Sequence, residues 1–462
     1  MKMQALTENR SHAITRDWPI IFTAGAGFFL SAMDTGIMNV ALPALSQIFH
    51  SNVRVMAWTA TLYLLLLSAT IVVFGRISDR VGRLKVYSMG LIVFAIASLL
   101  CGMSFSATQL ILFRGLQGIG AAMLQATSAA IITTCIPQER RGAALGTLGM
   151  ILGLGNILGP GAGGLLLSFA GWPWIFWINL PICAVGLWGS FKLAKATKES
   201  CARVPLNLTG NLFLGVAVFG FLYGLSADTV DGFARTLPFC FFAAALTGFV
   251  VWEARAAHPI VPLSLFRKVR FVVPVWSGLV LGFATAIAFI APAYFLEEIA
   301  ALEPWQVGLV NLAAPAGLVL LSGRSGRLIG TCGTARLTSA GLALMLIALL
   351  TLSAMQLNWH TAVYGALLLL YGIGAGLFIP ANLSAIMGSV SETLQGTIGS
   401  VQRMIHNIGL AVGTSAATAV LHFNSGTEAA GALPVYRSLW MMAAAAVLLA
   451  LLGSVSLSRL RR

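Results

Sequence analysis

The sequence predicts an all-α polytopic membrane protein, and three observations favour this class. Of its 462 residues, 58% are hydrophobic and only 9% are charged, whereas soluble domains carry about 25% charged residues. Long apolar stretches recur along the whole chain. The basic residues flank these stretches on alternate sides, as they do around membrane-spanning helices.

We count fourteen apolar stretches, and most approach or exceed the ~20 residues that cross a bilayer. Two of them are short, so twelve spans is an alternative count. A β-barrel is excluded, because barrel strands alternate over ~10 residues and these stretches do not. The predicted spans are Trp18–Val40, Met56–Phe74, Val86–Phe105, Gln109–Thr134, Ala143–Phe169, Trp172–Leu193, Leu206–Leu225, Leu237–Trp252, Phe271–Phe295, Trp305–Leu321, Leu337–Met355, Ala362–Met387, Ile398–Leu421 and Tyr436–Val455.

The net charge of +14 reflects membrane topology. If the N-terminus is cytoplasmic, all but four of the 28 Lys and Arg residues fall on the cytoplasmic side. Arg54, Arg235 and Arg437 are then external, and Arg114 lies within a span. We therefore expect no nucleic acid as partner, and a multi-pass protein of a bacterial-type inner membrane with both termini cytoplasmic. The first span is too long for a signal-peptide core, so we expect it to be retained.

The connections between spans are too short for a soluble catalytic domain. If the first six and last six spans form two six-helix bundles, two extra helices are inserted between them. The loop GRISDRVGRLK after span two has a fainter echo, GRSGRLIG, after span ten, consistent with parallel halves. The expected segments are a cytoplasmic N-terminal segment (1–17), a first bundle (18–198), the inserted pair (199–268), a second bundle (269–457) and a cytoplasmic tail (458–462).

Asp34 is the only ionisable residue of the first predicted span. An acid within the bilayer costs roughly 2.5–3.5 kcal/mol on insertion scales and usually faces a wet cavity or a charged partner. Counted from the external ends of their spans, Asp34 and Arg114 both lie roughly 7–9 Å below the outer boundary. Matched depth permits an ion pair or electrostatic coupling. The alternative is a snorkelling arginine and an unrelated acid.

The turn after span two predicts a latch. It carries Asp79 among basic residues, between two glycines that permit close backbone approach or positive φ. Asp79 can accept from a helix N-terminus or a neighbouring arginine and so hold the cytoplasmic side in one conformation. The alternative is an ordinary basic loop that sets topology.

A glycine stripe predicts close helix packing in span five. Glycines at 142, 146, 149 and 153 share one helical face, and small residues on one face let membrane helices approach closely. Pro160 follows and is expected to bend the helix. The stripe serves either static packing or a rocking element.

Five motifs in order resemble the major facilitator superfamily, and the resemblance covers nearly the whole chain. The Gly-Pro motif is similar to the antiporter signature of its drug:proton exporters, and the last motif and the loop from Trp252 to Phe266 look like the fourteen-span branch. The motifs are Asp34–Pro43, Gly75–Lys85, Arg114–Gly118, Gly155–Gly164 and Trp172–Pro181.

This resemblance implies roles for the motif residues. Asp34 and Arg114 would join proton coupling. The cytoplasmic gate would consist of Gly75, Asp79, Arg80, Gly82 and Arg83, and the antiporter motif of Gly155, Gly159, Pro160, Gly163 and Gly164.

Two positions depart from the family pattern. In the second-half echo Arg327 takes the place of the motif's Asp, which puts a symmetric latch in doubt. His406 stands where the branch often has Arg. Since histidine titrates near pH 6.5, His406 either protonates in the cycle or is a hydrogen-bonded packing residue.

The predicted function is proton-coupled export of small amphiphilic or cationic compounds by alternating access. The chain lacks the Gly-x4-Gly-Lys-[Ser/Thr] phosphate loop, so we expect no cofactor and a proton gradient as the energy source. The alternative is a dedicated exporter of one metabolite, such as a siderophore or an organic acid, because few acids other than Asp34, Glu297 and Glu298 lie in spans. Enzyme and metal motifs are absent, a channel is disfavoured, and the expected partners are substrate, protons and lipid around a monomer.

Overall fold

The computed structural model describes residues 2–196, 207–226, 233–256, 259–260, 262–300, 302–356, 359–391, 394–422 and 429–459. Within these ranges the protein is helical and contains no strand. The helices are α1 (Lys2–Ile48), α2 (Val53–Val81), α3 (Arg83–Gly102), α4 (Ala107–Cys135), α5 (Gln138–Phe169), α6 (Trp174–Trp177), α7 (Asn179–Ala196), α8 (Leu208–Ser226), α9 (Phe233–Arg255), η1 (Leu263–Arg267), α10 (Val269–Tyr294), η2 (Phe295–Ile299), α11 (Pro304–Asn311), α12 (Ala313–Cys332), α13 (Thr334–Ser353), α14 (Thr361–Met387), α15 (Gln395–His422) and α16 (Ala429–Arg459).

Fourteen of the described helical segments are long and apolar enough to cross a membrane, which favours fourteen spans over twelve. The two spans that looked short in the sequence are longer in the structure. α9 extends the apolar run at both ends, and α11 and α12 together form a candidate span from Gln306 to Cys332. Arg324 and Arg327 lie near the end of the span from Gln306 to Cys332, and a count of apolar residues stopped before them.

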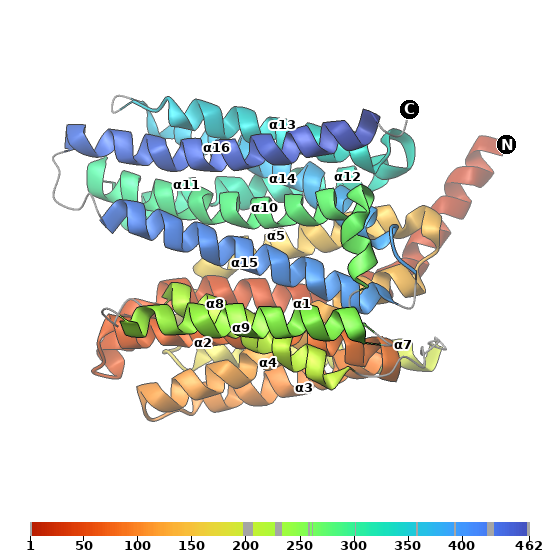
Figure 1. Ribbon diagram of the computed structural model, residues 1–462, viewed down its shortest axis with the longest axis horizontal. Coiled ribbons are helices and arrows are strands. Elements are labelled where there is room, and N and C mark those ends of the chain that lie inside the picture. The colour runs from red at the N-terminus through yellow and green to blue at the C-terminus, as the bar shows by residue number, and fades with distance from the viewer. Residues whose placement is uncertain are drawn as a thin grey trace.

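The helices form two bundles that lie side by side (Figure 1). Helices α1 to α7 make up the first bundle and α10 to α16 the second, and α5 and α15 lie where the two bundles meet. The second bundle has its own apolar core, in which Leu342, Met345, Leu368 and Trp440 are almost fully buried. Pro160 does not interrupt α5, which continues from Gln138 to Phe169.

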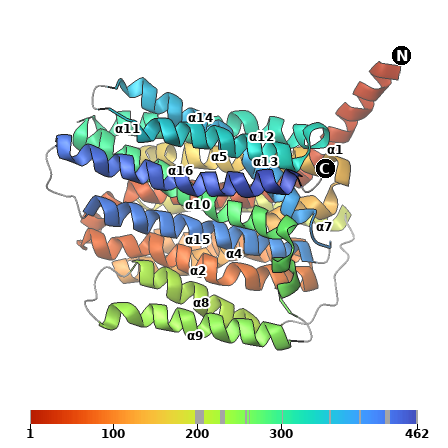
Figure 2. The same ribbon diagram turned by 45° about the horizontal axis from the view of Figure 1, so that its top comes forward.

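The inserted helices α8 and α9 lie against the outside of the first bundle (Figure 2). α8 packs on α2 through Trp58 and Tyr223, whose ring centroids are 5.6 Å apart. α9 packs on α8 through Phe221 and Phe242, with ring centroids 4.9 Å apart. The inserted pair therefore adds a layer without separating the two bundles.

The two chain ends lie at the same end of the bundles (Figure 1). We call this end the termini face. It holds the ends of α2 and α16 and the starts of α5, α10 and α15. The contacts between the bundles that are described below lie in the half of the molecule nearest this face.

Candidate functional site

Asp34 and Arg114 form a buried ion pair inside the first bundle. Arg114 Nη1 lies 2.6 Å from Asp34 Oδ2, and the two side chains are only 1% and 2% exposed. Asp34 comes from α1 and Arg114 from α4, so the pair joins two helices. The matched depth of the two residues in the sequence correctly indicated this contact.

Polar side chains that the sequence analysis did not single out complete the site. Gln117 Nε2 donates to Asp34 Oδ1 at 3.0 Å and Asn179 Nδ2 donates to the same oxygen at 3.3 Å. Arg114 also donates to Gln117 Oε1 at 2.6 Å and to the Thr59 carbonyl at 3.3 Å. Both carboxylate oxygens of Asp34 thus accept hydrogen bonds, as buried polar groups require.

A chain of contacts leads from this ion pair toward the second bundle. The Arg114 guanidinium lies 4.4 Å from the centre of the Tyr63 ring, and the Tyr63 hydroxyl is 3.0 Å from Ser31 Oγ. Gln125 Nε2 donates to Ser31 Oγ at 2.6 Å, and its Oε1 accepts from Arg403 Nε at 2.8 Å. Arg403 belongs to α15, so the chain crosses from one bundle to the other.

In the sequence, the helical spacing of the polar residues is the pattern that indicates this chain of contacts. Arg114, Gln117 and Gln125 lie at i, i+3 and i+11 and therefore share a face of α4. On α1, Ser31 and Asp34 are three residues apart, which again places them on one face. Uncharged polar residues at helical spacing inside apolar spans could have pointed to the site.

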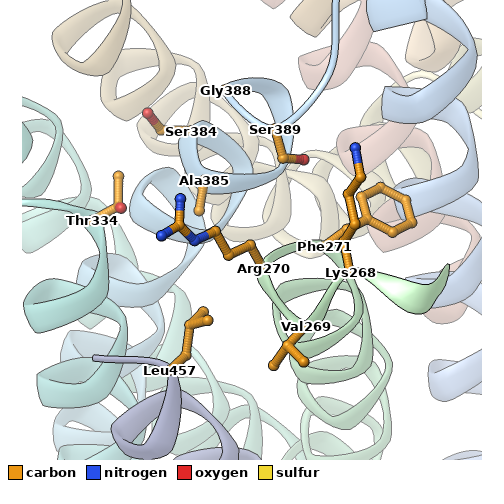
Figure 3. Close-up of a pocket in the computed structure, with 10 residues that line it drawn as sticks. All are labelled: Lys268, Val269, Arg270, Phe271, Thr334, Ser384, Ala385, Gly388, Ser389 and Leu457. Atoms are coloured by element: carbon orange, nitrogen blue, oxygen red, sulfur yellow. The ribbon is translucent and has the colours of Figure 1, made fainter. Parts of the chain in front are cut away.

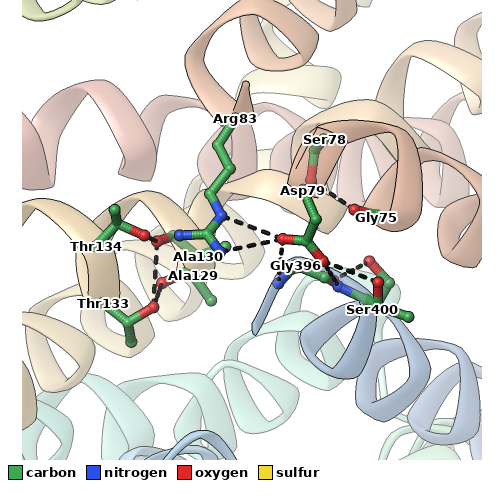
Figure 4. A network of polar contacts seen from close by, with 11 residues as sticks. Gly75, Ser78, Asp79, Arg83, Ala129, Ala130, Thr133, Thr134, Gly396 and Ser400 are labelled. Carbon is green, nitrogen blue, oxygen red and sulfur yellow. Dashed lines mark hydrogen bonds and ion pairs between the residues drawn. The ribbon is translucent and has the colours of Figure 1, made fainter. Parts of the chain in front are cut away.

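Asp79 joins the two bundles at the termini face (Figure 4). Its Oδ2 accepts from the backbone N–H and the hydroxyl of Thr397, each at 2.8 Å, and its Oδ1 accepts from the Gly396 N–H at 3.0 Å. Arg83 Nη2 lies 3.1 Å from the same Oδ1. A carboxylate at the end of α2 thus caps the N-terminus of α15, where the helix dipole favours negative charge.

Glycine is required at two positions of this motif for different structural reasons. A Cβ at Gly75 would lie 2.7 Å from the Gly396 carbonyl oxygen, so glycine permits the approach of α15. Gly82 adopts φ 114° between α2 and α3, a region that other residues rarely occupy. Arg80 is exposed and has no place in the ion pair, whereas Arg76 is buried and donates to the Pro259 carbonyl at 3.3 Å.

The glycine stripe of α5 makes the second contact between the bundles. A Cβ at Gly146 would lie 2.6 Å from the Ser322 carbonyl oxygen, and one at Gly142 would lie 2.7 Å from the Gly326 carbonyl oxygen. Ser322 Oγ donates to the Gly146 carbonyl at 2.9 Å. No carboxylate takes part in these contacts, and Arg327 is exposed. The pairing of α5 with α12 therefore depends on backbone proximity and the Ser322 hydrogen bond. The pairing of α2 with α15 combines a close backbone approach at Gly75 with the Asp79 carboxylate.

The antiporter motif packs within the first bundle. A Cβ at Gly155 would lie 2.9 Å from the Phe29 carbonyl oxygen, and one at Gly159 would lie 2.7 Å from the Met33 carbonyl oxygen. Gly163 packs on Ile37 in the same way, whereas Gly161 and Gly164 have nothing within 4 Å of a built Cβ. One face of α5 thus contacts α12 near the termini face and another contacts α1 further along.

The structure does not bring His406 to the Asp34–Arg114 pair. His406 Nδ1 lies 3.3 Å from the Gly278 carbonyl oxygen of α10, within the second bundle. Glu297 lies in η2 beyond the end of α10, away from the contacts described above, and the side chain of Glu298 is outside the described part of the structure.

Arg403 is the largest departure from the sequence analysis. We counted it among the cytoplasmic flanking charges, which is wrong, because it lies eight residues inside α15. It is half-buried against Gln125 and the Phe28 ring, whose centroid is 5.2 Å from the guanidinium carbon.

A pocket of about 620 Å³ lies elsewhere, at the termini face of the second bundle (Figure 3). Lys268, Arg270, Thr334, Ser384 and Ser389 are among its lining residues. It includes none of the residues of the Asp34 site. Among the described residues, no group of three or more His, Cys, Asp and Glu could hold a metal ion.

A buried ion pair inside one of two helical bundles, with Asp79 bonded across to the other bundle, fits the two-bundle architecture of membrane transporters. Residues 24–414 match the sequence profile of the Major Facilitator Superfamily. The chain belongs to this superfamily, and it is a multi-pass membrane transporter of the bacterial type.

Curated relatives include transporters of different cargo. The chain is 29% identical to a riboflavin transporter of Clostridioides difficile over 401 residues, which cover 86% of this chain and 87% of the relative. It is 29% identical to a multidrug transporter of Bacillus subtilis over 86% of this chain and 74% of the relative. A methylenomycin A resistance protein of Bacillus subtilis is 28% identical over 89% of each chain.

Solved structures share the fold. A human organic anion transporter superposes with a TM-score of 0.64 at 18% identity, covering 93% of this chain and 99% of that chain. A bacterial homologue of the iron transporter ferroportin, in an outward-facing state, gives a TM-score of 0.67 at 14% identity, covering 95% of this chain and 99% of that chain. The fold and the relatives are those of transporters, not of enzymes.

Proposed function

We propose that the protein exports small amphiphilic compounds in exchange for protons, by alternating access across a bacterial inner membrane. The observation that carries this proposal is the buried Asp34–Arg114 ion pair. A buried acid in a membrane helix is by default a functional residue. The drug-resistance and export relatives support the export direction.

Protonation of Asp34 is the coupling step of this proposal. It removes the negative charge that Arg114 faces and turns one acceptor oxygen into a donor. Removing one partner of a buried ion pair typically costs about 3–5 kcal/mol, so the first bundle is driven to repack. An energy of this size biases two conformations by more than a hundredfold.

The latch and the glycine stripe supply the two conformations. In the structure Asp79 holds α15, and Gly142 and Gly146 hold α12, so the bundles are joined at the termini face. We propose that this face is cytoplasmic, in keeping with the Lys and Arg distribution. The structure then represents the state in which access from the cytoplasm is blocked.

Two substrate classes are candidates, and the pairing of the buried charges supports one over the other. A cationic drug would need an unpaired acid in the cavity, but the buried acids of the described candidate spans all have partners. They are Asp17, Asp34, Asp79 and Glu253. Arg403, in contrast, pairs with no carboxylate among the described residues. This favours the second candidate, a dedicated exporter of a metabolite such as an organic acid or a siderophore, over a broad exporter of cations.

An export assay tests the proposal. Compounds of both classes are loaded into cells that lack their own exporters, and efflux is followed with and without a proton gradient. We expect gradient-dependent efflux by the wild type and its loss in Asp34→Asn, which keeps the volume of the side chain. Efflux that persists after the gradient is collapsed would remove the basis of proton coupling.

A further inference from the structure

Arg403 carries a charge into the centre of the molecule. It lies about 12 Å from the start of α15 at 1.5 Å per residue, well inside the span. Its neighbours belong to the other bundle: Gln125 on α4 accepts from its Nε, and Phe28 on α1 lies beside the guanidinium. Arg403 therefore lies between the two bundles, in contact with the first and carried by the second.

The guanidinium is only partly used. Its Nε is bonded to Gln125 Oε1 at 2.8 Å, whereas neither terminal nitrogen meets an acceptor among the described residues. These nitrogens are not among the enclosed unpartnered atoms of the described structure, and the side chain is half-buried. The two terminal nitrogens of Arg403 are therefore not sealed off inside the protein and have no protein acceptor among the described residues.

The charges of the connected network do not cancel. Arg114, Arg403 and Asp34 are its charged members, and the one carboxylate is already paired with Arg114. The residues that link the two arginines, Gln125, Ser31 and Tyr63, are all neutral. One positive charge inside the membrane thus lacks a counter-ion, and such a charge is costly unless a partner arrives.

We infer that Arg403 is an anchor for an anionic group of the exported compound. A planar guanidinium with both terminal nitrogens free matches a carboxylate, a sulfonate or a similar oxyanion through two parallel hydrogen bonds. Phe28 beside it offers an aromatic surface for the apolar part of the same compound. The substrate class is therefore an amphiphile with one acidic group, a narrowing that rests on the proposed function.

Arg403 also explains how such a compound is sensed by both bundles. The anchor belongs to α15, which Asp79 caps at the termini face, and its positioning partner Gln125 belongs to α4, which carries Arg114. An anion on Arg403 would compete for a charge that now faces the first bundle. Substrate binding and the Asp34 pair are thus linked through neighbouring residues.

The test measures binding without any gradient. Purified protein in nanodiscs is titrated into fluorescein, an anionic xanthene dye, and into rhodamine 123, a cationic dye with the same ring system, and fluorescence anisotropy is recorded. Four proteins are compared: wild type, Arg403→Gln, Arg403→Lys and Arg336→Gln. Arg336 is exposed on α13, so its substitution removes an equal charge away from the centre.

We expect wild type to prefer fluorescein, and Arg403→Gln to bind it at least tenfold more weakly while rhodamine 123 binding is unchanged or stronger. Arg403→Lys should fall between them, because it keeps the charge but not the fork, and Arg336→Gln should behave as wild type. Wild type that binds no fluorescein overturns the inference, as does an equal loss of both dyes in Arg403→Gln. Wild type that binds fluorescein but shows no proton-driven efflux in cells would instead contradict the proposed function alone.

Discussion

Asp79→Asn should open the termini face. The substitution keeps the side-chain volume but removes the charge that faces Arg83, Gly396 and Thr397. Asn offers one acceptor oxygen in place of two, so at least one N–H at the start of α15 loses its partner. Hydrogen bonds to charged groups contribute roughly 1.5–3 kcal/mol each, and their weakening here should shift the closed state by about 2–4 kcal/mol, or roughly 30- to 1,000-fold.

This shift can be measured as a distance distribution. Spin labels on Gln138 and Gly330, exposed residues near the termini face of the two bundles, are introduced in a cysteine-free background and read by pulsed electron resonance. Wild type should show mainly the short distance and Asp79→Asn a second, longer population.

A matched control separates the latch from a general effect of losing an acid. Asp17 pairs with Arg140 at 2.9 Å, and α1 and α5 both belong to the first bundle. Asp17→Asn should therefore leave the distances unchanged. If Asp79→Asn keeps the wild-type distances and wild-type efflux, the motif serves topology alone and the reasoning is refuted.

Three further predictions concern packing and topology. Gly146→Leu, which places side-chain atoms against Ser322, should abolish efflux with insertion retained, whereas Gly161→Leu, where a Cβ has open space, should be neutral; equal efflux in the two variants contradicts the contact of α5 with α12. Gly82→Ala should lower the free energy of unfolding by about 1–3 kcal/mol, because φ 114° is strained for alanine. An unchanged melting temperature would contradict this prediction. A reporter fused after Arg462 should be active only in the cytoplasm, and activity outside the cell would overturn the proposed topology.

Hydropathy predicted the fold because every span buries apolar side chains in lipid or in the bundles. The ion pair was also predictable, since Asp34 and Arg114 are rare charges at matched depth. The glycines at 142, 146, 149 and 153 indicated a close contact but not its partner, because spacing describes one face and not what covers it. Only the structure shows that α12 lies there.

The rest of the site escaped the sequence for physical reasons. Gln117, Asn179 and Gln125 are uncharged, so their cost inside a span is small and hydropathy does not mark them. Arg403 was counted with the cytoplasmic charges although the predicted span Ile398–Leu421 already contained it, because an arginine near the start of a span can snorkel to the boundary. The helix begins at Gln395, which places Arg403 about two turns inside. Contacts between bundles join residues far apart in the chain and leave no local pattern.

The central claim is that Asp34 carries the proton that drives export. It is tested most directly by adding an exported compound to purified protein in weakly buffered detergent solution and recording proton release with a pH indicator. Wild type equilibrated at a pH that protonates Asp34 should release about one proton for each compound bound, as the pair with Arg114 re-forms. Asp34→Asn should release none while still binding. Undiminished release by Asp34→Asn would contradict the account and assign coupling to another group.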